Sequence, residues 1–136
     1  MSSKPPKAVE IFIDRSLGRK IALPLAEAGA IVHLHDDHFA QDAEDQQWLT
    51  EVGKRGWLVL TKDQRIRYRP LEREALLNAN VKAFCFMSGN VTFAEMAEVV
   101  SKALPSIIKI ANKYDPPFIA GIYKDAIVKI VFPSRK

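Results

Sequence analysis

The segment at residues 57–63 reads Trp-Leu-Val-Leu-Thr-Lys-Asp, an apolar run that ends on aspartate. A short, continuously apolar run is typical of a central strand in a parallel sheet, because helices cover both faces of such a strand. Two earlier runs, at residues 11–13 and 31–35, have the same form. They are followed by Asp14 and by the pair Asp36-Asp37. The sequence therefore predicts three parallel strands that each end on aspartate.

These aspartates are expected to meet in space, because parallel strands carry their carboxyl ends on one edge of the sheet, where open α/β sheets bind ligands. Asp45 opens a predicted helix over Gln46–Lys54, whose N-terminus faces the same edge. Any one of these residues is as well explained by a helix cap or a turn, so the argument depends on their repetition. Clustered carboxylates repel one another and favour a bound cation. A Mg²⁺ or Mn²⁺ site suited to phosphodiester chemistry is the prediction.

The rest of the chain continues the alternation of strands and helices. Helices are predicted at residues 17–28, 71–77 and 92–114, a fourth strand at 81–86, and a C-terminal β-hairpin at 118–132. Thr92 and Glu95 fit a capping box, and Pro105 is expected to bend or divide the last helix. The order predicts an α/β fold, a three-layer α/β/α sandwich with a mostly parallel central sheet. Residues 1–7 are interpreted as an N-terminal arm and residues 8–136 as a single domain.

Composition narrows the function classes. The 136 residues carry a formal net charge of +4, which suits a polyanionic substrate handled around an acidic pocket. The one cysteine, Cys85, lies in an apolar stretch, so a buried inert thiol is expected and no internal disulfide can form. No run has the character of a signal peptide or a membrane span. A cytoplasmic protein without a membrane partner is therefore expected.

Polar and basic residues follow the predicted strands and are candidates for substrate binding. Those at the sheet edge that could hold phosphates or orient a ligand are Arg15, Thr61, Lys62, Arg65, Arg67, Ser88 and Asn90. Tyr68 could stack on an unpaired base. A solvated basic loop and a helix cap at Asn90 are the alternative interpretations. No glycine-rich phosphate loop of the common nucleotide-binding classes is present.

The three histidines do not have the spacing of a zinc site. His33 and His35 are predicted on the same face of one strand, so a packing role is expected for both. His38, beside Asp37, is a candidate for the rim of the pocket.

Several segments together resemble the PIN-domain ribonucleases, and among them the compact PIN-like group related to VapC toxins. The resemblance is carried, in chain order, by residues 14–18, 35–39, 45–49, 60–67 and 87–90. It covers roughly residues 8–120. The ordered set of motifs is more specific than any one of them.

This resemblance implies a parallel sheet between helices and an acid cluster that binds Mg²⁺ or Mn²⁺. It also implies endonucleolytic cleavage of RNA, with the protein as toxin of a toxin–antitoxin pair, an antitoxin protein as partner, and a homodimer left open. Asp14, Asp45 and Asp63 match three family acids and are the expected catalytic metal ligands, and Thr61 matches the hydroxyl of the Thr-x-Asp motif. Asp37 is the expected outer helper. The remaining family acid, a glutamate, has no direct match, and its candidates here are Asp36, Asp37, Asp42 and Glu44.

Two other functions compete with a ribonuclease. A catalytically inactive PIN-like module that binds RNA or protein would tolerate the unmatched acid. A receiver-type phospho-acceptor would also place aspartates at strand ends, but it needs an acidic pair after its first strand. Here Arg15-Ser16 follow Asp14 instead. Binding of Mn²⁺ separates the ribonuclease from the inactive module.

Overall fold

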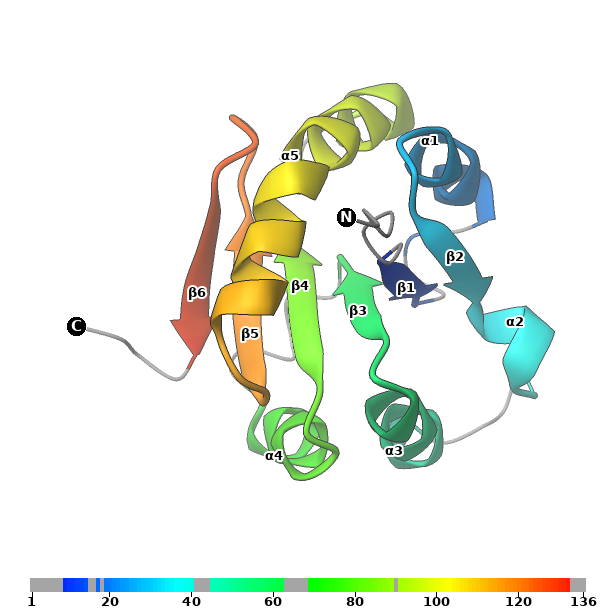
Figure 1. Ribbon diagram of the computed structural model, residues 1–136, viewed down its shortest axis with the longest axis vertical. Coiled ribbons are helices and arrows are strands. Elements are labelled where there is room, and N and C mark those ends of the chain that lie inside the picture. Colours follow the sequence, from blue (N-terminus) through cyan, green and yellow to red (C-terminus); the bar gives the residue numbers. More distant parts are fainter. Residues whose placement is uncertain are drawn as a thin grey trace, which may run out of the picture.

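The computed structural model describes residues 9–14, 17, 19–40, 45–62, 69–89 and 91–132. Strands and helices alternate along the chain, as the apolar periodicity predicts (Figure 1). The elements are β1 (Glu10–Ile13), η2 (Arg19–Ile21), α1 (Ala22–Glu27), β2 (Ile31–Leu34), α2 (His35–His38), α3 (Asp45–Arg55), β3 (Leu58–Thr61), α4 (Pro70–Asn78), β4 (Lys82–Phe86), α5 (Phe93–Lys113), β5 (Phe118–Ile122) and β6 (Val128–Phe132).

The six strands form one sheet in the order β2-β1-β3-β4-β5-β6. Neighbours are parallel from β2 through β5, and the β5–β6 pair is antiparallel. Ile13, the last residue of β1, pairs with Leu34 on one side and Leu60 on the other. The carboxyl ends of β2, β1 and β3 are therefore nearly level. The predicted mostly parallel sheet and its C-terminal hairpin are confirmed.

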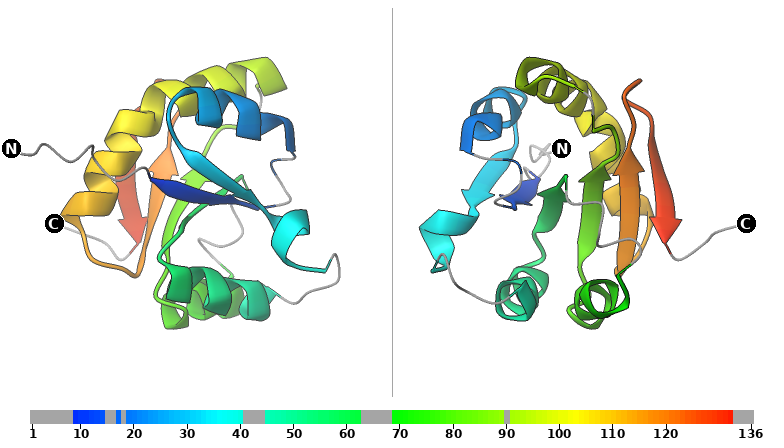
Figure 2. Two further views of the ribbon diagram at one scale, coloured as in Figure 1. Left: turned by 45° about the vertical axis from the view of Figure 1, so that its right-hand side comes forward. Right: turned by 180° about the vertical axis from the view of Figure 1, so that it is seen from behind.

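Helices cover both faces of the sheet, with α1 and α5 on one side and α3 and α4 on the other (Figures 1 and 2). Alternating residues of each strand enter two separate cores. In β1, Ile11 and Ile13 pack in the core under α1 and α5, whereas Phe12 packs with Trp48 of α3 in the second core. Burial on both faces explains the continuously apolar strands. The α/β/α sandwich is confirmed.

The helix ends follow their local sequence. Gly29 has φ of +105°, and the backbone N–H groups of Gly29 and Ala30 bond back to Ala26 and Leu25, which is a Schellman ending for α1. At the start of α5, the Thr92 hydroxyl accepts from the Glu95 N–H while the Glu95 carboxylate accepts from the Thr92 N–H. The predicted capping box is confirmed. Pro105 does not divide α5, which continues to Lys113 along a curved path (Figure 1).

One element was not predicted. The strand β2 ends at Leu34, and residues 35–38 form the short helix α2. β1 also ends at this level, so a longer β2 would have no strand beside it. Asp36 and Asp37 lie in the first turn of α2, where the helix dipole favours acidic side chains. The prediction that His33 and His35 share one strand face is therefore wrong.

Cys85 is fully buried, as expected. Within the described ranges, no helix is long and apolar enough to span a membrane.

Candidate active site at the carboxyl edge of the sheet

Asp14 and Thr61 meet at the carboxyl edge although 47 positions separate them in the sequence. Asp14 directly follows β1, and its backbone N–H donates to the carbonyl of Leu60 at 3.0 Å. Thr61 ends the neighbouring strand β3 and is 2% exposed. Its Oγ1 donates to Oδ2 of Asp14 at 2.8 Å. A hydroxyl that donates to a carboxylate fixes the orientation of the acid.

Other predicted residues lie at the ends of the neighbouring strands. On one side, the exposed Asp36 and Asp37 follow β2 within α2. On the other side, Lys62 is exposed directly after Thr61, and Ser88 lies two positions after β4. The strand order β2-β1-β3-β4 therefore places two acids, Asp14, a lysine and a hydroxyl along one edge.

Asp45 is the first residue of α3, as predicted. The chain passes from the carboxyl end of β2 to the start of the parallel strand β3, so α3 begins near the carboxyl edge and runs back from it. The N-terminus of a helix carries positive potential, which favours a carboxylate there. The side chain of Asp45 lies outside the described part of the structure. So do the whole residues Arg15, Asp42, Glu44, Asp63, Arg65, Arg67, Tyr68 and Asn90.

The described residues alone do not form a group of three histidine, cysteine, aspartate or glutamate side chains that could hold a metal ion. The expected ligand set includes Asp45 and Asp63, so the site cannot be assembled from the described side chains. The donor chemistry is nevertheless uniform, since Asp14, Asp45 and Asp63 all offer carboxylate oxygen. Hard cations such as Mg²⁺ and Mn²⁺ prefer this ligand type, so the residues present fit such an ion.

A hollow of about 350 Å³ opens at the carboxyl edge, next to Lys62, which directly follows Thr61. Its walls are formed by residues at or just after the ends of β3 and β4, by Leu17 shortly before η2, and by the start of α5. The lining residues are Leu17, Lys62, Phe86, Ser88, Gly89, Val91, Thr92, Phe93 and Met96. Lys62 and Ser88 were predicted as substrate contacts. Phe93 was not, because its helical spacing from Met96 and Val100 indicates an ordinary core position.

The histidines behave differently from one another. His35 is 4% exposed and packs among Phe12, Phe39 and Trp48, with ring centroids 5.7–6.0 Å away. Its Nδ1 has no hydrogen-bond partner among the residues that the structure describes, and it lies 3.6 Å from a carboxylate oxygen of Asp36. The expected packing role is thus observed for His35, although the residue sits in a helix.

His33 forms a second cluster with Glu10 of β1, His38 of α2 and Trp57, which precedes β3. Its ring stacks on Trp57 at 3.6 Å, its Nε2 lies 3.1 Å from the Glu10 carboxylate, and its Nδ1 lies 3.2 Å from Nε2 of His38. The pKa of His38 lies below the ordinary value, chiefly because neighbouring protein displaces water, and secondarily because of the charges of His33 and Arg55. His38 therefore belongs to this cluster, and its predicted place on the pocket rim gains no support.

The family model described as "PIN like domain" matches residues 9–88, which is more than half of the 136-residue chain. The chain belongs to the PIN like domain family. A curated relative from Mycobacterium tuberculosis (strain ATCC 25618 / H37Rv), named "Putative ribonuclease VapC45", is 28% identical over 126 residues. That match covers 89% of this chain and 91% of the relative. No solved structure matches significantly. The family predicted from the sequence motifs is thereby confirmed.

Proposed function

We propose that this PIN like domain is an endoribonuclease that uses Mg²⁺ or Mn²⁺ and serves as the toxin of a toxin–antitoxin pair. The observation that carries the proposal is the hydrogen bond from Thr61 Oγ1 to Asp14 Oδ2. It joins the first acid of the predicted site to the hydroxyl of the Thr-x-Asp motif, so two motifs that are distant in sequence meet at the strand ends. The relative named as a ribonuclease supports the same activity.

In this proposal the residues at the carboxyl edge have three roles: metal binding, phosphate binding and orientation of bound groups. Asp14, Asp45 and Asp63 would hold the metal ion, and Asp37 would orient water or a ligand from the next strand end. The ion would supply Lewis-acid activation of water and stabilise the leaving oxygen. Thr61 holds Asp14 in a fixed orientation. Lys62, with Arg15, Arg65 and Arg67, would bind phosphates, while Ser88 and Asn90 would orient groups at the mouth of the site.

The RNA substrate and a cognate antitoxin protein are the partners that follow from this activity, and a homodimer remains open. Cleavage of RNA by the purified protein with Mg²⁺ or Mn²⁺, and its loss with a chelator, tests the proposal. Asp63→Asn should abolish cleavage while circular dichroism shows an unchanged fold. Undiminished cleavage by that variant would overturn the assignment of the acids.

A catalytically inactive module that binds RNA or protein is the alternative. This alternative is favoured by the family glutamate that has no direct match among Asp36, Asp37, Asp42 and Glu44. Isothermal titration with Mn²⁺ separates the two. Binding that is lost in Asp14→Asn supports the nuclease, whereas no detectable binding by the wild-type protein supports the inactive module.

A further inference from the structure

Two of the residues that line the hollow at the carboxyl edge are directly linked to the Asp14–Thr61 pair. Leu17 lines the hollow, and its backbone N–H donates to the carbonyl of Asp14 at 3.1 Å. Lys62 lines it as well and directly follows Thr61. A molecule in this hollow would therefore lie next to the candidate reacting centre.

The lining combines an apolar floor with one large aromatic ring that is open to solvent. Leu17, Phe86 and Met96 are at most 5% exposed, whereas Phe93 is 41% exposed. Phe93 continues the apolar face of α5 that buries Met96 and Val100, but it lies at the very start of the helix. The hollow there leaves the ring without a full covering of side chains. An exposed aromatic ring that shares a hollow with buried apolar side chains can stack on a flat ligand.

The start of α5 is not arranged to bind a phosphate. The capping box occupies the N–H groups of Thr92 and Glu95, at 3.0 and 3.1 Å. Hydrogen bonds from the backbone and side chain of Thr92 to the Glu95 carboxylate lower the pKa of Glu95. A carboxylate therefore stands where an anion would otherwise bind the helix end. A neutral, flat group fits this hollow better than a phosphate does.

We propose that this hollow binds one unpaired nucleobase of the RNA substrate, with Phe93 as the stacking residue. This inference rests on the proposed function. The volume of about 350 Å³ lies within the range of small-molecule sites. Unpaired bases are commonly recognised by stacking on aromatic side chains, with hydrogen bonds to their edges. Lys62 binds a phosphate adjacent to that base, and the Ser88 hydroxyl reads the base edge.

The test compares two fluorescent oligomers of equal length, one of uridine nucleotides and one of abasic nucleotides with the same phosphates. Binding is measured by anisotropy at fixed salt in Asp63→Asn protein, which prevents cleavage of the RNA. Adding Phe93→Ala should weaken binding of the uridine oligomer about 5- to 100-fold, the range for loss of one base stack. Binding of the abasic oligomer should not change. Phe93→Trp should retain the difference between the two oligomers.

Ile31→Ala is the matched control. Ile31 is 46% exposed, close to the value for Phe93, but it begins β2 and so lies at the opposite edge of the sheet. It should leave both affinities unchanged. If Phe93→Ala weakens both oligomers equally, or neither, the inference is overturned and the proposed function stands. If the Asp63→Asn protein binds neither oligomer, RNA binding and the proposed function fail together.

Discussion

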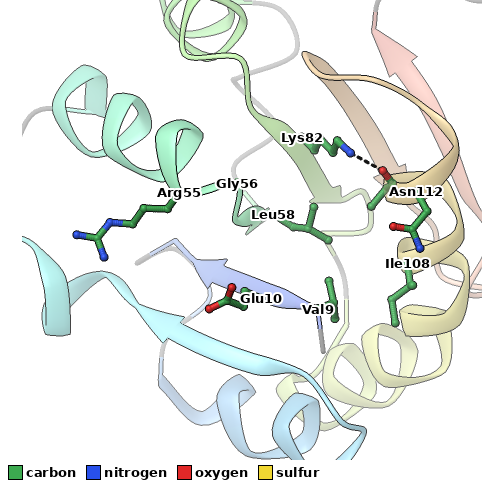
Figure 3. A pocket seen from close by; sticks show the side chains of 9 residues that line it. Val9, Glu10, Arg55, Gly56, Leu58, Lys82, Ile108 and Asn112 are labelled. Atoms are coloured by element: carbon green, nitrogen blue, oxygen red, sulfur yellow. Dashed lines mark hydrogen bonds between the residues drawn. The ribbon is translucent and has the colours of Figure 1, made fainter. Parts of the chain in front are cut away.

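The two edges of the sheet each carry a hollow of similar size, about 350 Å³ at the carboxyl edge and about 330 Å³ at the amino edge. Both contain charged side chains, yet the charges are arranged differently. The amino-edge hollow is lined by Val9, Glu10, Arg55, Gly56, Leu58, Lys82, Ile108, Ala111 and Asn112 (Figure 3). Size alone therefore does not identify a site in this fold.

At the amino edge, the charged groups serve the fold. Lys82 Nζ donates to the carbonyl of Ala111 in the last turn of α5 (Figure 3). Arg55 pairs with Glu51 at 2.9 Å and lies 4.9 Å over the ring of Trp57. Glu10 accepts from His33. Helices in this topology end at the amino edge, and cations near their last carbonyls stabilise them.

At the carboxyl edge, helices begin instead of ending. α3, α4 and α5 all start there, with Asp45 as the first residue of α3. The positive potential of helix starts favours acids and anionic ligands. The direction of the parallel strands therefore separates two sets of charged groups: structural cations lie at the amino edge, and the described acids Asp14, Asp36 and Asp37 follow strands at the carboxyl edge.

The two ends of β1 give the largest expected contrast. Asp14→Asn should lower the rate of RNA cleavage about 100- to 1000-fold, as removal of one preorganised electrostatic group does. Glu10→Gln makes the same chemical change at the other end of the strand and should leave the rate unchanged. Single-turnover cleavage assays measure both, with circular dichroism to verify folding. Equal losses in the two variants would remove the functional distinction between the edges.

Two glycines differ in how closely the surrounding structure packs against them. A Cβ on Gly53, in α3, would lie 2.0 Å from the carbonyl oxygen of Ala79. Gly53→Ala should therefore lower the free energy of unfolding by about 1–3 kcal/mol, the usual cost of overpacking. At the carboxyl edge, no described atom lies within 4 Å of a Cβ added to Gly89, so Gly89→Ala should change the free energy of unfolding by less than about 0.5 kcal/mol. Urea unfolding measures both, and an unaffected Gly53→Ala would contradict this packing.

Two lysines repeat the contrast on a smaller scale. Lys82→Met should lower the free energy of unfolding by about 1 kcal/mol, because the end of α5 loses a charged donor. Lys62→Met should leave stability nearly unchanged and reduce the salt dependence of RNA binding by about one phosphate contact. Urea unfolding and binding titrations over a range of salt concentrations test the pair. A loss of stability in Lys62→Met, together with a reduced salt dependence of RNA binding in Lys82→Met, would contradict the difference between the two edges.

The smallest effect concerns pH. The pKa of His38 is lowered from 6.5, first by desolvation and then by His33 and Arg55, while Asp37 opposes the shift. The folded protein thus binds this proton less tightly than the unfolded chain. The contribution of His38 to the free energy of unfolding is complete above pH 6.5, and it is lost as pH falls below that value towards the lower pKa of the folded protein.

The stability difference between the wild-type protein and His38→Gln should therefore shrink as pH falls from about 7 to about 5. RNA binding at a fixed pH should be the same in both proteins, since His38 belongs to the cluster around Trp57. Urea unfolding at several pH values measures the difference. A difference that stays constant with pH would contradict the lowered pKa.

The sequence determined the elements and the order of the acids. Strands, helix ends and the capping box depend on neighbours within a few positions, so apolar periodicity and local motifs are sufficient to predict them. The aspartates after β1 and β2 and at the start of α3 were predicted for the same reason. The continuous apolar run at residues 57–63 was sufficient to predict a central strand, because only a strand buried on both faces needs it.

The tertiary structure decided which of these residues meet. The bond between Thr61 and Asp14 depends on β3 lying next to β1, and that strand order is not encoded in either segment alone. The end of β2 at Leu34 depends on where β1 ends, and the close contact at Gly53 depends on how α3 packs beside α4. Phe93 has the spacing of a core residue, but it is 41% exposed and lines the hollow at the carboxyl edge. Contacts between distant segments follow from packing, which local sequence patterns do not describe.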